Sequence, residues 1–186
     1  MYCVNYFVPL NMKSKDIKYL DFVVDKLTKS IENVVSGDSF ATDLTYLQKT
    51  DLPQVTKTKG WVFDWKQELN YNDREVYKLT IQNNPRIIQG LVSFKIMPDH
   101  VYMPLIESSP FNKGRHKIYL GVPGNLVAYG CRLSFQKGFE GFLAFHSKTS
   151  LIDHYTKTLG AKLFGGLLMI IDTEAANKLV DKYYKM

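Results

Sequence analysis

The chain of 186 residues is long enough to bury a core of its own and suits one domain. Hydrophobic residues make up 45% of it and aromatic residues 13%, which is typical of a globular protein and excludes a disordered one. Charge or glycine interrupts every apolar run well before the roughly 18 residues that a membrane span requires. Two cysteines, Cys3 and Cys131, are too few for a disulfide framework or a metal cluster. We therefore expect a cytoplasmic protein with no membrane segment and no metal site.

The formal charge is +6, and most of the excess lies in the second half of the chain. Residues 101–186 hold 11 Lys and Arg against 6 Asp and Glu. This excess suits a polyanionic ligand bound by that half, and a solvated surface with scattered lysines explains it equally well. No run of five like charges occurs, so nucleic acid is the least expected partner.

The N-terminal part of the chain predicts a helix followed by an irregular connection. Ser14 is a suitable N-cap and Gly37 a suitable end, and the apolar positions between them keep to one helical face. The chain after Gly37 contains Asp, Thr, Pro and Gly, which indicate irregular structure around a short turn of helix. The expected division is one domain at 1–186, with a variable helical segment at 1–60 and a core at 61–186.

Four strands are expected next. Trp61, Phe63 and Trp65 alternate in the first of them, and turn signals at 83–85 and 98–99 separate the later ones. Links this short join antiparallel neighbours, so the segment predicts an antiparallel meander. The expected strands cover residues 60–69, 75–82, 86–97 and 100–108.

The basic loop that follows leads into a predicted helix and a further strand. Pro123 suits the first helical turn, and Gly138 suits the position after the last. Gly130 indicates a close backbone approach, because glycine in mid-helix costs about 1 kcal/mol relative to alanine. The strand at 139–147 should run parallel to residues 101–107, because a helix crosses between them.

A short capped helix is expected after this strand. Ser150 and Asp153 form a capping box at its start, and Gly160 ends it. Tyr155 lies on its apolar stripe, so the helical pattern alone makes Tyr155 a core residue. A hairpin or a kinked strand follows, and a last helix begins at Thr173.

Pro104 indicates a site as well as a fold, because it lies in the middle of a strand that the topology makes internal. Proline within a sheet is confined to edges and bulges, and a bulge would bend this strand away from its parallel neighbour. Two parallel strands that separate leave a wedge, which an extended ligand fills by pairing like an added strand. The next helix begins at 121–125, where free N–H groups and the helix dipole favour an anion.

The order of these elements and two sequence stretches resemble the GNAT superfamily of acyl-CoA-dependent N-acetyltransferases. "HYTKTLGAK" at 154–162 is similar to the family's Y-x-x-x-L-G element, and "LLMIID" at 167–172 resembles its closing strand. The run from "LIESSPFN" to "LIDHYTKTLGAK" further resembles a group of bacterial GNAT-like proteins. The likeness covers residues 76–172, whereas residues 1–50 match no pattern.

The sequence departs from the family's pattern in two places. The family's pyrophosphate loop reads Q/R-x-x-G-x-G/A, and the three marked positions here are Tyr119, Val122 and Gly124, so only the last agrees. Gly121, one residue early, is a partial substitute. Lys148 stands where the family often has an asparagine.

The resemblance implies an α+β fold with a mixed, mostly antiparallel sheet and helices on both faces. Acetyl-CoA would lie in the wedge as a co-substrate, and its acetyl group would pass to an amine. Tyr155 would be the general acid that protonates the departing thiolate, and Glu107 would be the base. The coenzyme would contact six residues through their backbone: Leu105, Ile106, Gly121, Val122, Gly124 and Asn125. Its nucleotide phosphates would meet Lys113, Arg115, His116 and Lys117.

Other interpretations stay open from the sequence. Glu107 suits a solvated strand end as well as it suits a base, and His146 is a second, less favoured candidate base. Cys131 is expected in the core. The altered pyrophosphate loop favours a binding or regulatory module that keeps the fold without catalysis. The sequence names neither the acceptor, which is a small-molecule or protein amine, nor an oligomeric state.

Overall fold

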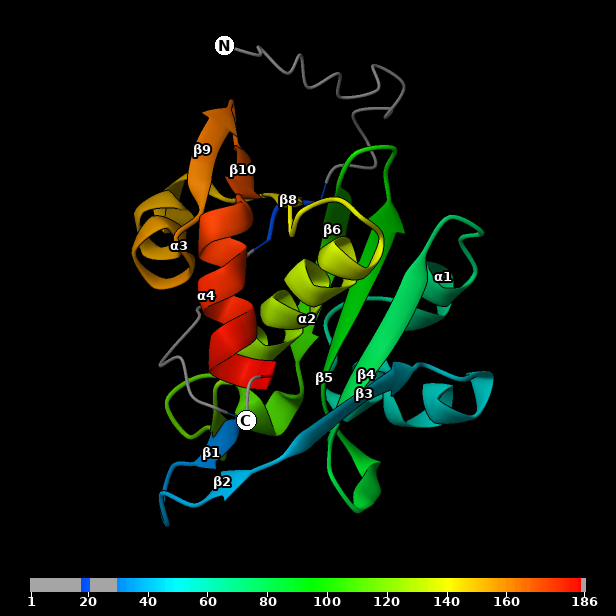
Figure 1. The fold of residues 1–186 in the computed structure, drawn as a ribbon. Helices are drawn as coiled ribbons and strands as arrows, with labels where there is room; N and C mark the ends of the chain where they lie inside the picture. Colours follow the sequence, from blue (N-terminus) through cyan, green and yellow to red (C-terminus); the bar gives the residue numbers. More distant parts are fainter. Residues whose placement is uncertain (1–17, 21–29, 185–186) are drawn as a thin grey trace, which may run out of the picture.

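The computed structural model describes residues 18–20 and 30–184. Its centre is a seven-stranded sheet of order β3-β4-β5-β6-β8-β10-β9 (Figure 1). All neighbours in this sheet are antiparallel except β6 and β8, which run parallel as predicted. The strands are β3 (Thr42–Tyr46), β4 (Glu75–Ile81), β5 (Asn84–Ile96), β6 (Val101–Ser108), β8 (Leu143–His146), β9 (Lys162–Gly165) and β10 (Leu168–Ile171).

Helices cover both faces of the sheet, which confirms the predicted α+β class. Leu91 and Val92 are successive residues of β5 and point into different core clusters, so the two clusters lie on opposite faces. The larger cluster packs under three helices, and α4 crosses in front of α2 in Figure 1. The smaller cluster packs under α1. The helices are α1 (Trp65–Leu69), α2 (Val122–Gln136), α3 (Ile152–Leu159) and α4 (Thr173–Tyr184).

Most helices and strands of the core form where the sequence predicted them. β4, β5, β6 and α2 lie close to their predicted bounds, and Gly160 ends α3 with φ 68°. The close approach at Gly130 is present but comes from a side chain, since a Cβ there would lie 2.6 Å from Cε1 of Phe94. The predicted capping box of Ser150 is wrong, because a 3₁₀ turn precedes α3 and Leu151 is its N-cap, with no side-chain hydrogen bond.

The predicted N-terminal helix is wrong where the structure describes it. Residues 14–17 and 21–29 of that helix lie outside the described part of the chain. Ile31–Asn33 forms β1, which pairs with β2 (Ser39–Phe40) and β7 (Tyr119–Leu120) in a second, three-stranded sheet. Ile31 is fully buried in the larger core cluster, so a tertiary contact overrides the helical spacing here.

The strand predicted at 60–69 is also wrong, because this segment contains α1. Asp64 is its N-cap and accepts a hydrogen bond from the backbone N–H of Gln67 at 2.9 Å. Trp65 is fully buried against the sheet. The meander still has four strands, because β3 takes the missing place. The 3₁₀ helix at Lys49–Gln54 is the short helical turn that the sequence predicted in this region.

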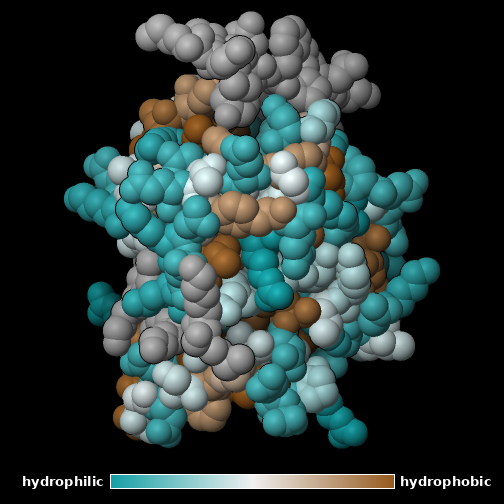
Figure 2. Space-filling view, viewed as in Figure 1, coloured by the Kyte–Doolittle hydropathy of each residue, from teal (hydrophilic) through white to brown (hydrophobic). Residues whose placement is uncertain are grey.

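The C-terminal strands form a tight hairpin at one edge of the sheet. β9 and β10 pair antiparallel across Gly165 and Gly166, which selects the hairpin over a single kinked strand. Leu163 and Phe164 of this edge strand are 51% and 48% exposed. In Figure 2 hydrophobic surface gathers over this hairpin, beside a largely hydrophilic face over α3 and α4. No helix of the described chain is long and apolar enough to span a membrane.

Candidate functional site

A β-bulge at Pro104 disturbs the pairing of β5 with β6. Ser93 lies opposite Leu105 and Lys95 lies opposite Tyr102, so two steps along β5 correspond to three along β6. The extra residue lies beside Pro104, which has no N–H to donate to a neighbouring strand. The bulge that the proline predicted is therefore present.

β6 and β8 separate at this bulge. Their parallel pairing consists of Val101 with Leu143 and Tyr102 with Ala144. Both strands continue beyond these pairs, and the described residues of the two strands form no further pair with each other. A wedge therefore opens between their C-terminal ends, as the sequence predicted.

The chain's own Leu20 occupies part of this wedge. Its N–H donates to the carbonyl of His146 at 2.7 Å, and its carbonyl accepts from the N–H of Lys148 at 3.4 Å. These bonds form a parallel bridge between Leu20 and Ser147. The dark blue segment beside β8 in Figure 1 marks the place. A strand-like residue of the chain thus lies where the sequence predicted a ligand.

The directions of the hydrogen bonds along β8 fix the side on which Leu20 lies. The carbonyl of Phe142 accepts from Val101 of β6 at 3.1 Å, and the carbonyl of His146 accepts from Leu20. The N–H of Ser147 donates the other way, to Leu167 at 2.9 Å. Alternate residues of a strand direct their backbone groups to the same edge, so Leu20 lies on the edge of β8 that faces β6. It takes the place beside β8 that β6 no longer fills.

Tyr155 is fully buried on the α2 face of the sheet, as its helical pattern predicts. Its ring meets the ring of Phe145 edge to face, with the centroids 5.3 Å apart. Phe145 belongs to β8, which forms one wall of the wedge, and Leu20 belongs to the same core cluster. The position suits the predicted general acid, and that role stays a prediction.

Glu107 is a buried carboxylate, 4% exposed, and not the solvated strand-end residue that the sequence also allowed. Its Oε1 accepts from the N–H of Val62 at 2.7 Å and from Nζ of Lys113 at 2.5 Å. Its Oε2 accepts from Nε1 of Trp65 at 2.7 Å and from the N–H of Phe63 at 3.4 Å. A role as base stays a prediction and requires one of these donors to leave.

The first turn of α2, the predicted pyrophosphate site, is buried. Gly121 is the N-cap, with φ 83°, and Val122, Gly124 and Asn125 are all buried. Pro123 removes one of the N–H groups that a first turn presents to an anion. Two glycines still leave backbone without side chains at this end of the helix.

The side chain of Asn125 is engaged within the protein. Its Nδ2 donates to Oγ1 of Thr42 at 2.8 Å, and its Oδ1 accepts from the hydroxyl of Tyr184 at 3.0 Å. Burial holds the pKa of Tyr184 well above its ordinary value, so the phenol is a stable donor. Asn125 therefore joins α2 to β3 and to the end of α4.

The predicted basic cluster is divided by the fold. Lys113 turns toward β6, where it forms an ion pair with Glu107. Arg115 and His116 are exposed on the loop between β6 and α2. Contact of these residues with nucleotide phosphates stays a prediction.

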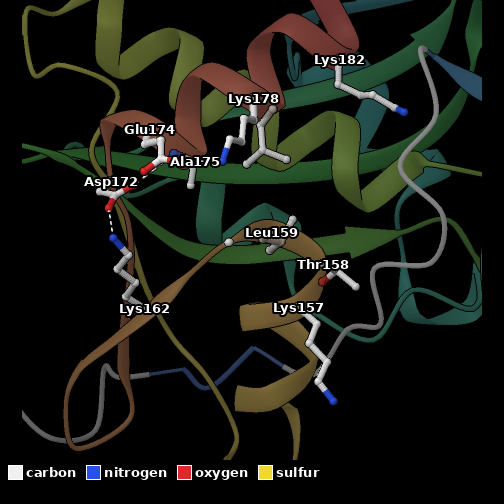
Figure 3. A pocket seen from close by; sticks show the side chains of 11 residues that line it. Lys157, Thr158, Leu159, Lys162, Asp172, Glu174, Ala175, Lys178 and Lys182 are labelled. Carbon is white, nitrogen blue, oxygen red and sulfur yellow. Dashed lines mark hydrogen bonds and ion pairs between the residues drawn. The ribbon is translucent and has the colours of Figure 1, made fainter.

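An open pocket of about 480 Å³ lies between α3 and α4 (Figure 3). Lys162 pairs with Asp172, whose pKa the Lys162 ammonium lowers, and Lys178 pairs with Glu174 at 2.7 Å. The pocket keeps a modest positive charge, because two of its lysines have no carboxylate partner among the described residues. The lysines that line it are Lys157, Lys162, Lys178 and Lys182.

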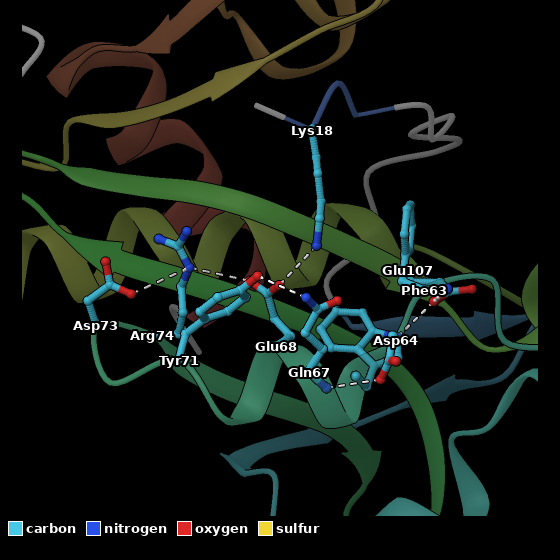
Figure 4. A network of polar contacts seen from close by, with 10 residues as sticks. Lys18, Phe63, Asp64, Gln67, Glu68, Tyr71, Asp73, Arg74 and Glu107 are labelled. Atoms are coloured by element: carbon cyan, nitrogen blue, oxygen red, sulfur yellow. Dashed lines mark hydrogen bonds and ion pairs between the residues drawn. The ribbon is translucent and has the colours of Figure 1, made fainter. Parts of the chain in front are cut away.

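A polar network that the sequence did not reveal lies on the opposite face, at α1 (Figure 4). Glu68 is 1% exposed and contacts Nζ of Lys18 at 3.1 Å and Nε of Arg74 at 3.5 Å. The pattern of residues 60–69 indicated a strand, and it carries no signal that would place Glu68 in the interior.

Tyr102 and His146 meet where β6 and β8 separate. The Tyr102 hydroxyl and Nδ1 of His146 are 3.0 Å apart. Burial raises the pKa of Tyr102 to about 12 and lowers the pKa of His146, so a neutral imidazole faces a protonated phenol. The phenol then donates to Nδ1, and a role of His146 as base would require this hydrogen bond to break.

Comparison with known proteins finds likeness at the level of structure. No protein-family model matches the chain, and no curated protein matches it. A chimera of the spermidine N-acetyltransferase of Vibrio cholerae with a second enzyme matches with a TM-score of 0.50 and 14% identity, over 73% of this chain and 98% of its own. A point mutant of the Vibrio cholerae enzyme gives the same TM-score, identity and coverage of this chain, over 96% of its own.

A further match is an N-acetyltransferase of Thermoplasma acidophilum solved with coenzyme A, with a TM-score of 0.46 and 12% identity. It covers 70% of this chain and 96% of its own. At identities this low the likeness shows the fold alone. The matches at a TM-score of 0.50 confirm the predicted GNAT fold.

Proposed function

We propose that this protein is an N-acetyltransferase that moves an acetyl group from acetyl-CoA to an amine. The observation that carries the proposal is the wedge between β6 and β8 at the Pro104 bulge. The solved structures that share the fold are N-acetyltransferases by name, which supports the same class of reaction here. The wedge offers an extended ligand a place to pair like an added strand.

Acetyl-CoA, as we propose, uses the side of the wedge that Leu20 leaves free. The pantetheine arm pairs with the β6 edge at Leu105 and Ile106, because the backbone of Leu20 bonds to β8. The pyrophosphate lies at the first turn of α2. Its proposed contacts are the backbone groups of Gly121, Val122 and Gly124. The predicted contact with Asn125 is not among them, because the N–H of Asn125 already donates to the carbonyl of Gly121 at 2.9 Å.

The proposed chemistry is direct attack of a neutral amine on the thioester. The amine nitrogen bonds to the carbonyl carbon, the C–S bond breaks, and the sulfur leaves with the electron pair. Tyr155 gives its hydroxyl proton to this thiolate and regains one from solvent, while Glu107 takes the proton that the amine loses. A phenol stays protonated at neutral pH, so Tyr155 has a proton to give to the thiolate.

Both groups are buried in the described structure, and this sets a requirement for the reaction. A thiolate reaches Tyr155 only when the groups that cover the phenol move. An amine reaches Glu107 only when one of its four donors leaves. Binding of acetyl-CoA must therefore be coupled to a local rearrangement around the wedge.

A thermal-shift titration with acetyl-CoA tests the proposal, with ATP as a control for anion binding. Saturation at about a hundred times Kd stabilises a protein by roughly 2.7 kcal/mol. At about 2–4 °C per kcal/mol for a chain of this size, we expect a rise in Tm of several degrees. The same rise with ATP, or none at millimolar acetyl-CoA, contradicts the proposal and supports a binding module that keeps the fold without the reaction.

Tyr155→Phe tests the proposed acid in the same preparation. The variant should keep the acetyl-CoA shift and lose turnover by about 10²-fold or more, because a general acid contributes on that scale. Tyr129→Phe on α2 is the matched control, since Tyr129 packs against Tyr77 away from the wedge. Equal turnover of Tyr155→Phe and Tyr129→Phe removes Tyr155 from the mechanism.

A further inference from the structure

Glu68 is a carboxylate buried on the α1 face of the sheet, with two cations beside it. Oε2 accepts from Nζ of Lys18 at 3.1 Å, and Oε1 lies 3.5 Å from Nε of Arg74 (Figure 4). The Arg74 side chain is itself nearly buried, whereas that of Lys18 is 38% exposed. Lys18 therefore closes the cluster from the solvent side and is the member that an incoming ligand displaces with least disruption.

Several polar atoms of this cluster have unused hydrogen-bonding capacity. Within the described chain no hydrogen bond reaches Nη1 of Arg74 or Oγ of Ser93, and both atoms are buried. Oε1 of Glu68 and Nε of Arg74, also buried, make no contact shorter than their 3.5 Å ion pair with each other. Ser93 lies opposite Val76 of β4, two residues after Arg74. Buried polar side-chain atoms are hydrogen-bonded in the large majority of cases. A group of unsatisfied atoms beside a buried carboxylate indicates a site that binds a polar ligand.

The cluster adjoins the bulge where the wedge opens. Ser93 lies opposite Leu105 of β6, next to Pro104. Tyr102 lies on the other side of the bulge, and its hydroxyl meets His146 at the wedge. The cluster thus lies on the α1 face at the point where, under the proposed function, the thioester would be attacked.

Residues 18–20 connect this cluster to the wedge. Leu20 bonds to β8 within the wedge, and its side chain packs in the core cluster on the α2 face. Two residues earlier, the amine of Lys18 reaches Glu68 on the α1 face. The segment therefore passes between β6 and β8 and presents a primary amine to the buried carboxylate on the far side.

We propose that Glu68 is the carboxylate that binds the acceptor in its ammonium form, before the loss of the proton that precedes attack, and that Lys18 occupies this site as an intramolecular competitor of a primary alkyl amine. The assignment of the site to the acceptor rests on the proposed acetyltransferase function. A primary ammonium on a methylene stem is what the carboxylate already holds, so a free alkyl amine of the same form replaces Lys18 without a change in charge. Displacement of Lys18 also removes one anchor of the segment that carries Leu20.

The experiment is a calorimetric titration of n-butylamine into the protein, without any acyl-CoA. Lys18→Met removes the competing charge and keeps most of the stem. We expect it to raise the affinity for n-butylamine about ten-fold. A site that Lys18 leaves open for about one-tenth of the time binds a ligand about ten-fold more weakly than a site that is always open. Lys66→Met, on the exposed side of α1, is the matched control and should leave the affinity unchanged.

Adding Glu68→Gln to Lys18→Met should abolish the gain in affinity, and n-butanol should not bind to Lys18→Met. An unchanged affinity in Lys18→Met, or a gain that survives Glu68→Gln, overturns the proposal. A thermal melt establishes that each variant is folded. If Glu68→Gln does not fold, the comparison of n-butylamine with n-butanol on Lys18→Met decides, and equal binding of the two overturns the proposal.

This test separates the inference from the function on which it rests. Amine binding gained by Lys18→Met, with no thermal shift from acetyl-CoA, keeps the ammonium site and contradicts the acetyltransferase. An acetyl-CoA shift with no gain in amine binding keeps the acetyltransferase and overturns the role of Lys18.

Discussion

Glu107 shows that a carboxylate at the end of a strand can have a structural role when it is buried. Its two oxygens accept from the backbone of residues 62 and 63, from the Trp65 indole and from the Lys113 ammonium. These donors come from the segment before α1, from the first residue of α1 and from the loop before α2. One carboxylate therefore fastens two irregular segments to β6, which is a structural role that needs no ligand.

Glu107→Gln separates this anchoring role from the role of base. A glutamine places an NH₂ group where two donors now point, so we expect the free energy of unfolding to fall by about 2–4 kcal/mol, within the range for a broken buried polar network. Glu174→Gln, in an exposed pair on α4, is the control and should leave the free energy of unfolding almost unchanged. Urea unfolding measures both. Unchanged stability with turnover lost by about 10²-fold would instead identify Glu107 as the base.

At the scale of elements, α2 fits the sheet because of one missing side chain. Gly130 faces the sheet, and a Cβ there would meet Phe94 at 2.6 Å and Leu143 at 3.1 Å. Both neighbours are buried and belong to central strands, so neither has free space into which it could move. Glycine at this position has a lower helix propensity than alanine, but it lets α2 lie closer to β5 and β8.

Gly130→Ala should therefore destabilise the protein although alanine is the better helix former. The gain of about 1 kcal/mol in helix propensity is offset by overpacking, which costs typically 1–3 kcal/mol and more where a ring must move. We expect a net loss of about 1–2 kcal/mol in the free energy of unfolding, measured in urea. Gly165→Ala is the matched control, since nothing lies within 4 Å of its Cβ position. A stabilised Gly130→Ala would show that α2 can move away from Phe94.

The elements that the sequence predicted correctly are those with clear local boundary signals. β4, β5 and β6 are separated by turn residues at 83–85 and 98–99, α2 and α3 carry apolar stripes, and Pro104 marks the bulge because proline has few other uses in an internal strand. The prediction of a strand at 60–69 was wrong, because alternating aromatic residues occur both in a strand and in a loop that folds over the sheet. Asp64 is the local signal that would have found α1, as a side-chain N-cap.

The candidate site was only partly predictable, and for a physical reason. Pro104 and Gly121 are local signals, so the wedge and the glycine N-cap of α2 could be expected from the sequence. The contact of Leu20 with His146 and the contact of Lys18 with Glu68 join distant parts of the chain. No periodicity encodes such contacts, because they depend on which segments the completed sheet brings together.

At the scale of the whole molecule, the N-terminal part of the chain contacts both ends of the proposed coenzyme path. Leu20 lies in the wedge, where the pantetheine arm is proposed. Glu32 of β1 pairs with Leu120 of β7, directly before Gly121 and the first turn of α2. The region that the sequence marked as variable thus contributes to the surroundings of the candidate site rather than forming a separate appendage.

Asn125 makes a comparable connection within the first turn of α2. It links β3, α2 and α4 through Thr42 and Tyr184, which lie far from it in sequence. The resemblance to acetyltransferases places the same residue at the pyrophosphate through its backbone. The two roles involve different atoms, since the side chain bonds Thr42 and Tyr184 whereas the resemblance implies a backbone contact alone, so a side-chain variant can distinguish them.

Asn125→Ala should lower stability and leave coenzyme binding intact. The variant removes the partners of the Thr42 and Tyr184 hydroxyls, and losing the partner of a buried polar group costs about 1–3 kcal/mol. We expect the free energy of unfolding to fall by about 2–3 kcal/mol. Asn177→Ala, on the exposed side of α4, should change it by less than about 0.5 kcal/mol. The rise in Tm with acetyl-CoA, measured from each variant's own baseline, should equal that of the unmodified protein. Unchanged stability with a lost acetyl-CoA shift would mean that the side chain itself holds the coenzyme and that its bonds to β3 and α4 contribute little.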